Sequence, residues 1–161
     1  MMKPRIYVET SVISYLAARP SRNALTAFRQ EQTRRWWEKS AGVFALEASD
    51  LVRLEIASGD ATAAKRRLDV FLELSVLPLH DGVSAFGKRL MTEGLVPRSE
   101  PEDASHIAQA TLTGADYIAT WNFAHLVGPQ TKYRLVQSIE RWGYKAPLLA
   151  TPEEILEGVL S

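Results

Sequence analysis

The chain has 161 residues, of which 46% are hydrophobic, and its 19 basic and 19 acidic residues give a formal charge of zero. A chain of this length buries roughly 70% of the surface that it exposes when unfolded, so it forms a core without disulfides or a structural metal. The absence of cysteine excludes disulfide scaffolds, iron–sulfur clusters and thiolate zinc sites. The charge balance argues against a broadly basic nucleic-acid binder.

The chain also lacks the sequence features of membrane and secreted proteins. No apolar run reaches the length of a membrane span, and the N-terminus lacks the apolar segment of a signal peptide. We therefore expect a soluble cytoplasmic protein without a membrane partner. No linker or internal repeat interrupts the sequence, which predicts one domain over residues 1–161.

Short segments rich in β-forming residues alternate with amphipathic helical segments along the chain. In chain order, the predicted elements are strand 5–8, helix 12–18, helix 24–39, strand 43–46, helix 51–57, helix 61–74, strand 76–79, helix 82–93, helix 101–113, strand 117–120, helix 132–142, strand 147–150 and a short helix from 152. Because helices connect the strands, the strands should be parallel, with helices covering both faces. The expected fold is α/β, a three-layer α/β/α sandwich around a parallel sheet of about five strands.

Local signals define the ends of these elements. Thr10 or Ser11 can serve as the N-cap of the first helix, and Thr151 and Glu154 have the spacing of a capping box before the last one. Pro78 weakens the third strand because it cannot donate a ladder hydrogen bond. Glycine follows five of the predicted helices, at positions 42, 59, 94, 114 and 143.

Polar side chains follow the first and fourth predicted strands, where each strand ends. In an open parallel sheet, ligands bind outside the carboxyl ends of the strands at the point where the strand order reverses. The residues in these two places are Glu9, Thr10, Ser11, Thr120, Asn122 and, further along, His125. If the first and fourth strands are neighbours, these residues form one pocket.

Two further acids belong to helices near the same edge of the sheet. Glu55 lies on the helix after the second strand, and Asp103 lies in the first turn of the helix before the fourth strand. Together with Glu9 and Asn122 they offer only hard oxygen ligands. Such a set suits Mg²⁺ or Mn²⁺ better than zinc or copper.

Four segments of the sequence resemble the motifs of the PIN-domain family, in the style of the VapC-type toxin nucleases. They are residues 6–15 (IYVETSVISY), 51–55 (LVRLE), 101–107 (PEDASHI) and 115–123 (ADYIATWNF). The resemblance covers nearly the whole chain, in order and at suitable spacing. It implies a Mg²⁺-dependent ribonuclease with an RNA substrate, and often a homodimer that a cognate antitoxin inhibits.

The sequence departs from the family pattern at two positions. Glu9 stands where the family usually has Asp, and Asn122 stands where the fourth motif usually has another acid. Asp116 precedes the fourth strand and should lie at the opposite end of the sheet, so it is a poor substitute. With three carboxylates and one amide, we expect one well-held metal and a second that is weak or arrives with the substrate phosphate.

The resemblance assigns a role to each residue of this set. Glu9 and Asp103 would be direct or water-mediated metal ligands, and Glu55 would hold a metal-bound water or assist its deprotonation. Asn122 would orient a water or donate to a phosphate oxygen. Supporting hydroxyls, and backbone N–H groups that favour an anion, would come from Thr10, Ser11 and Thr120.

Some neighbouring residues fit a structural role better than a functional one. His106 lies one turn after Asp103 on nearly the same helix face, which makes it a candidate supporting residue of the site. A histidine packed at the rim or bonded to backbone is, however, the commoner arrangement. Trp36 and Trp37 point about 100° apart on a helix, so one should be core and the other partly exposed. The aromatic residues near the pocket are more often packing residues than platforms for base stacking. Trp121, beside the predicted pocket, is the one to test for stacking.

The charges are unevenly distributed although they sum to zero. Residues 19–39 contain six basic and two acidic side chains, and residues 65–67 are all basic. Solvated helix faces are the commoner explanation for such runs. They can also guide a phosphate backbone toward an acidic pocket.

Three functions are compatible with these residues. The leading prediction is a Mg²⁺- or Mn²⁺-dependent endoribonuclease, the toxin of a toxin–antitoxin pair. The second is a PIN-like RNA-binding or regulatory domain whose nuclease activity is weakened or lost. The third is a metal-dependent phosphate-ester hydrolase that uses the same pocket.

Overall fold

A five-stranded parallel sheet forms the centre of the computed structural model, which describes residues 2–123 and 129–160. The strands are Arg5–Val8 (β1), Ala45–Ser49 (β2), Ser75–Leu77 (β3), Tyr117–Ala119 (β4) and Leu148–Ala150 (β5). Their order in the sheet is β3-β2-β1-β4-β5, and every neighbouring pair is parallel. The predicted α/β class and parallel sheet are confirmed.

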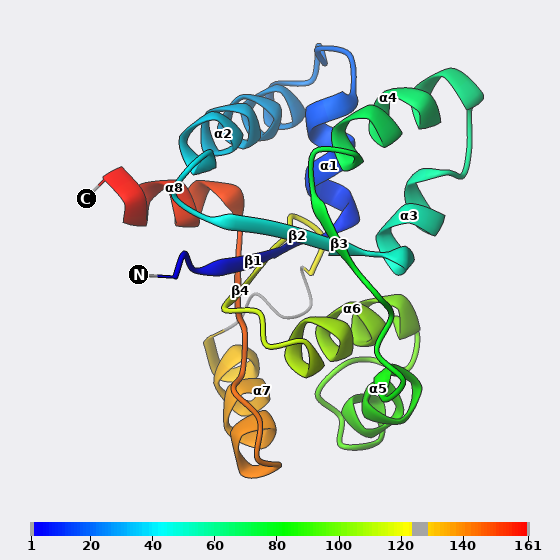
Figure 1. The fold of residues 1–161 in the computed structure, drawn as a ribbon, viewed down its shortest axis with the longest axis vertical. Coiled ribbons are helices and arrows are strands. Elements are labelled where there is room, and N and C mark those ends of the chain that lie inside the picture. Colours follow the sequence, from blue (N-terminus) through cyan, green and yellow to red (C-terminus); the bar gives the residue numbers. More distant parts are fainter. Residues whose placement is uncertain (1, 124–128, 161) are drawn as a thin grey trace.

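Helices cover both faces of this sheet. They are Thr10–Ala17 (α1), Ala24–Ser40 (α2), Asp50–Ile56 (α3), Ala61–Phe71 (α4), Val83–Thr92 (α5), Pro101–Leu112 (α6), Pro129–Arg141 (α7) and Pro152–Leu160 (α8). Figure 1 shows α1 to α4 on one face and α5 to α7 on the other, with α8 against α2. The predicted three layers are therefore present. None of the helices in the described part of the chain is long and apolar enough to cross a membrane.

The core lies on both sides of β1, the central strand. Ile6, Tyr7 and Val8 are all buried, as expected for a strand covered by helices on both faces. Trp36 is fully buried in α2, whereas the neighbouring Trp37 is only partly buried, as their helical spacing predicted.

Four of the five strands differ from their predicted boundaries, β4 and β5 by a single residue at one end and β2 and β3 by more. β2 extends to Ser49 instead of ending at residue 46, because pairing with β1 carries Glu47 into the strand and its carboxylate forms an ion pair with Arg5 (Nε–Oε2 2.9 Å). β3 ends at Leu77, one residue before Pro78. The Pro78 carbonyl instead accepts a hydrogen bond from Gln109 Nε2 on α6 at 2.9 Å.

The predicted helix ends are largely confirmed. All five glycines after helices have positive φ; at Gly114, for example, φ is 81° and the next N–H, from Ala115, bonds back to the Ala110 carbonyl at 2.9 Å. Thr151 and Glu154 form the predicted capping box through reciprocal hydrogen bonds. Other ends differ from the prediction, since α4 ends at Phe71 instead of residue 74 and α7 begins at Pro129 instead of residue 132. The cap of α1 also differs, because it is a residue of the site described below.

Candidate active site

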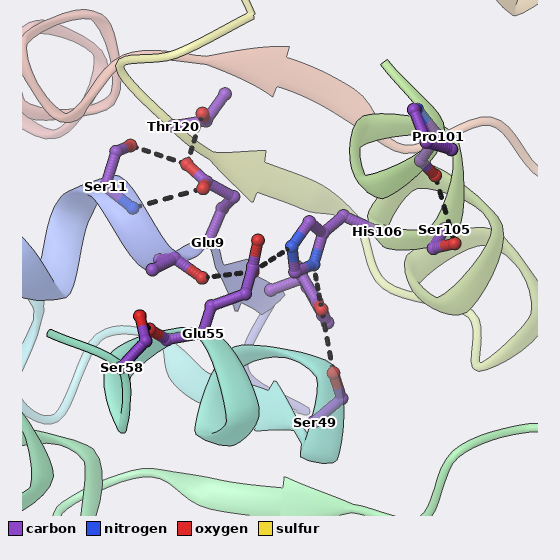
Figure 2. A network of polar contacts seen from close by, with 11 residues as sticks. Glu9, Ser11, Ser49, Glu55, Ser58, Pro101, Ser105, His106 and Thr120 are labelled. Atoms are coloured by element: carbon purple, nitrogen blue, oxygen red, sulfur yellow. Dashed lines mark hydrogen bonds and ion pairs between the residues drawn. The ribbon is translucent and has the colours of Figure 1, made fainter. Parts of the chain in front are cut away.

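The carboxyl ends of β1 and β4 lie side by side, since these two strands are hydrogen-bonded neighbours. Glu9 directly follows β1 and Thr120 directly follows β4, while α3 contributes Glu55 and α6 contributes His106. Figure 2 shows these side chains gathered into one polar network. The predicted convergence of residues after the first and fourth strands is thus present.

Glu9 is buried, only 3% exposed, and its carboxylate is the N-cap of α1. Oε2 accepts a hydrogen bond from the Ser11 backbone N–H (3.1 Å), and Oε1 accepts from the hydroxyls of Ser11 (2.5 Å) and Thr120 (2.6 Å). The prediction of Thr10 or Ser11 as the cap was therefore wrong. Because the Glu9 carboxylate reaches back over the first turn, it satisfies the N–H that a short side chain usually caps.

Glu55 is half-buried, and one of its oxygens is held by two partners. Oε1 accepts a hydrogen bond from Thr10 Oγ1 at 2.6 Å and lies 2.5 Å from His106 Nε2. Burial acts to raise the pKa of Glu55, but the hydrogen bond and charge of His106 and the Thr10 hydroxyl outweigh it and lower that pKa. The other oxygen, Oε2, has no hydrogen-bond partner among the described residues, so it remains available to a ligand.

His106 connects Glu55 to the core. Its Nδ1 lies 2.7 Å from the Tyr7 hydroxyl, which also lies 2.8 Å from Ser49 Oγ. His106 and Tyr7 are each 2% exposed. The expected contacts of His106, at the rim or with backbone, were wrong: both ring nitrogens bond to side chains. The sequence offers one clue to the role of Tyr7, since it lies two residues before Glu9 and so faces the same side of the strand.

Replacing Tyr7 by Phe is expected to destabilise the protein by about 1–3 kcal/mol. The substitution keeps the ring but leaves a buried histidine nitrogen and the Ser49 hydroxyl without their shared partner. Urea denaturation followed by circular dichroism would measure the loss. Ser49→Ala is the control. It removes only the last residue of the His106–Tyr7–Ser49 chain of hydrogen bonds, so it should lower the stability by less. A Tyr7→Phe protein as stable as wild type would contradict the network.

Asp103 is the carboxylate of the site whose pKa is raised. Burial raises its pKa to about 7, and the carboxylates of Glu100, Glu9 and Glu55 add to the rise, while His106 offsets only part of it. The sequence did not point to Glu100, the residue before Pro101. A cluster of negative charge that raises the pKa of one of its own members favours a bound cation.

The carboxylates of the site fit a divalent metal by their chemistry. Within residues 2–123 and 129–160, no three acidic or histidine side chains lie close enough together to hold an ion as they stand. Glu9 is not free to act as a ligand as it stands, because its two oxygens already accept hydrogen bonds from α1 and Thr120. Mg²⁺, however, binds through one or two carboxylates, with waters and substrate phosphates completing its shell. Glu55 and Asp103 offer two carboxylates of this chemical kind.

Asn122 stands apart from the carboxylates. It is exposed, and its backbone N–H donates to Thr120 Oγ1 at 3.1 Å. No hydrogen bond joins its side chain to Glu9 or Glu55 in the described part of the chain. Asp116 is at the opposite end of the sheet, as predicted, where it bonds to Arg5 N and Lys145 Nζ. The candidate His125 lies outside the described residues.

Comparison with known proteins places this site on a known fold. No family model and no curated protein matches the chain. It is similar in structure to VapBC2 from Rickettsia felis, solved bound to a DNA fragment from its promoter, with a TM-score of 0.57 and 14% identity over 91% of this chain and 98% of that chain. It is also similar to VapC20 of Mycobacterium tuberculosis, a Sarcin-Ricin loop cleaving toxin, with a TM-score of 0.52 and 17% identity over 86% and 95% of the two chains.

The chain therefore has the PIN-like fold of VapC toxins. This confirms, for the fold, the resemblance that the four sequence segments indicated. Glu9, Glu55 and Asp103 lie near the carboxyl edge of the sheet in this fold, close enough for the charges of Glu9 and Glu55 to raise the pKa of Asp103.

Proposed function

We propose that the protein is a metal-dependent endoribonuclease that hydrolyses RNA phosphodiester bonds. The observation that carries the proposal is the gathering of Glu9, Glu55 and His106 at the carboxyl edge of a VapC-like fold, where Thr120 bonds to Glu9 and His106 bonds to Glu55. The raised pKa of Asp103, on the neighbouring helix, supports it. An acidic cluster of this kind repels a phosphate unless a cation is present. Metal-dependent phosphodiester hydrolysis is the reaction class that uses such a site.

In this proposal Asp103 and Glu55 would hold a Mg²⁺ or Mn²⁺ ion. A cation there would supply positive charge to the reacting phosphate and lower the pKa of a water. Glu55 stays ionised near neutral pH, because its pKa is lowered, and would accept a hydrogen bond from the attacking water. Glu9 keeps the start of α1 in place, and with it the Thr10 hydroxyl that orients Glu55.

The proposed partners follow from the same likeness. The similar chains are named as toxins or as parts of VapBC assemblies. We infer that this protein is the toxin of a toxin–antitoxin pair, that a cognate antitoxin inhibits it, and that it forms a homodimer. Size-exclusion chromatography with light scattering, alone and with the product of a neighbouring gene, would test both associations.

Glu55→Gln is expected to lower the rate of RNA cleavage about a hundredfold. The amide still accepts a hydrogen bond from Thr10 but loses the charge that attracts the cation, a loss of several kcal/mol of transition-state stabilisation. Cleavage of a structured RNA with Mg²⁺ or Mn²⁺, stopped by EDTA, is the measurement. Glu102→Gln is the control, because it removes an exposed carboxylate of α6 that should not affect the rate.

The outcomes separate the three candidate functions. If Glu55→Gln cleaves RNA within about twofold of wild type, the proposed site is wrong. RNA binding without cleavage by the wild type, with either metal, favours an RNA-binding or regulatory domain. Turnover of simple phosphate esters without RNA cleavage favours a phosphate-ester hydrolase.

A further inference from the structure

A groove of about 340 Å³ lies beside the acidic site, between α1, the start of α2 and the residue after Trp121. Its volume is at the lower end of the roughly 300–1,000 Å³ of ligand pockets. Thr10 and Ser11 line this groove and also bond to Glu55 and Glu9. A ligand in the groove therefore lies next to the carboxylates.

The wall formed by the connection between α1 and α2 is fixed before any ligand binds. Gln30, a buried residue of α2, accepts a hydrogen bond from the Ser21 backbone N–H at 2.9 Å and donates to the Arg19 carbonyl at 3.0 Å. These two bonds hold residues 18–23 against α2, and Figure 1 shows this connection at the end of the two helices. Because the wall is held in place, little ordering entropy opposes binding.

Tyr15 gives the groove an aromatic surface that is also held in place. Its ring packs edge-on against Trp121, with 6.1 Å between ring centroids, and Trp121 Nε1 donates to Thr33 Oγ1 on α2 at 2.8 Å. Arg29 donates to the Tyr15 hydroxyl at 3.3 Å and lies 5.5 Å from the centroid of the Trp121 ring. A cation and a rigid aromatic ring are thus combined at one wall.

The groove also offers polar groups that the protein itself does not use. The Asn122 amide is exposed and has no hydrogen-bond partner among the described residues, so both its donor and its acceptor are available. Ser14 adds a hydroxyl on the α1 side. Two exposed arginines, Arg19 and Arg22, belong to the adjoining connection and give this side of the site a positive charge.

We propose that this groove binds one unpaired nucleobase of the RNA, next to the phosphate that enters the acidic site. The inference rests on the proposed ribonuclease function and adds a specificity to it. Proteins recognise single-stranded RNA by stacking splayed bases on aromatic rings and by hydrogen bonds to the base edges. The Tyr15 ring and the Asn122 amide supply these two contacts, and a base held inside a duplex cannot reach them.

Tyr15→Leu, compared with Tyr15→Phe, tests the inference. Tyr15→Leu should weaken binding of a short labelled oligoribonucleotide about tenfold, measured by fluorescence anisotropy in Ca²⁺, whereas Tyr15→Phe, which keeps the ring, should stay within about twofold. Thermal unfolding of each variant checks that it folds. Ala18→Trp, at an exposed position of the groove, should weaken binding by a similar factor without altering the core.

An abasic scan of the oligoribonucleotide locates the base. One abasic position should weaken binding to wild type about tenfold and cause no further loss with Tyr15→Leu, because both changes remove the same contact. If the two losses multiply while wild type cleaves RNA normally, the inference is wrong and the proposed function stands.

Other outcomes are equally decisive. The predicted losses in a protein that does not cleave RNA support the groove and refute the nuclease. If no groove variant changes RNA binding, the inference is wrong. A wild-type protein that binds no RNA overturns both proposals.

Discussion

Replacing Asp103 by Asn is expected to lower the rate of RNA cleavage by about a hundredfold to a thousandfold and, at the same time, to stabilise the protein at pH 8. The loss of activity follows from removing a carboxylate of the proposed cation site, which supplies several kcal/mol of transition-state stabilisation. The gain in stability follows from removing a charge that burial and three neighbouring carboxylates oppose. An active-site residue that lowers stability is a common trade-off in enzymes.

The stability gain has a defined pH dependence. The pKa of Asp103 is raised from 3.8 to about 7 on folding, so the folded protein binds the proton more tightly than the unfolded chain does. Stability from this group is fully present below about pH 4 and is lost as the pH rises through about 7. The Asp103→Asn protein does not lose stability in this way. It should therefore become more stable than wild type only above about pH 4, and the difference should reach its full size above about pH 7.

Because Asp103 is partly exposed, solvent screening reduces the effect. We expect about 1 kcal/mol, or about 2–4 °C in Tm for a domain of this size. Thermal unfolding in EDTA between pH 4 and pH 8 would measure it. Glu102→Gln removes a neighbouring exposed acid and should change neither Tm nor cleavage. A Tm of Asp103→Asn at pH 8 below that of wild type would contradict the proposed electrostatic cause.

Glu9→Ala is expected to have the opposite effect on stability. The substitution removes the cap of α1 and leaves two buried hydroxyls, of Ser11 and Thr120, without their acceptor. We expect a loss of about 2–4 kcal/mol in the free energy of unfolding, even without metal. Urea denaturation in EDTA would measure it.

The matched variant for this position is Glu9→Gln. Its amide oxygen still accepts from the two hydroxyls, so the loss of stability should be clearly smaller than for Glu9→Ala. If Glu9 instead acts only as a metal ligand, the neighbouring carboxylates would repel it when no metal is bound. Both variants would then stabilise the metal-free protein, as Asp103→Asn should. The sign of the change therefore distinguishes a positioning carboxylate from a ligand.

The fold was predictable from the sequence because its signals are local. Alternating strands and helices, glycine after five helices and polar residues after β1 and β4 all follow from short-range patterns. The predicted boundaries were wrong where a tertiary contact outweighs these local signals. Glu47 lies inside β2 because Arg5 on the neighbouring strand neutralises it, which no pattern within residues 43–49 shows.

The sequence indicated several residues of the candidate site but not their connections. Spacing and order indicated Glu9, Glu55 and Asp103, yet nothing local predicts that Thr120 bonds to Glu9 or that Tyr7 reaches His106. These contacts depend on side-chain directions across three different elements, and the pairs lie far apart in the chain. Sequence periodicity describes which face a residue occupies, not which distant side chain it meets.

The long sequence separation of the site contacts determines when the site can exist. Glu9 bonds to a residue 111 positions later, and Tyr7 bonds to one 99 positions later. A nascent chain that has emerged as far as α5 already contains Glu9 and Glu55, but it lacks Asp103, His106 and Thr120. Because such distant contacts form only after long loops close, the carboxylate cluster cannot assemble before α6 and the residue after β4 have been synthesised. A nascent chain that has not yet reached Thr120 therefore lacks the assembled site.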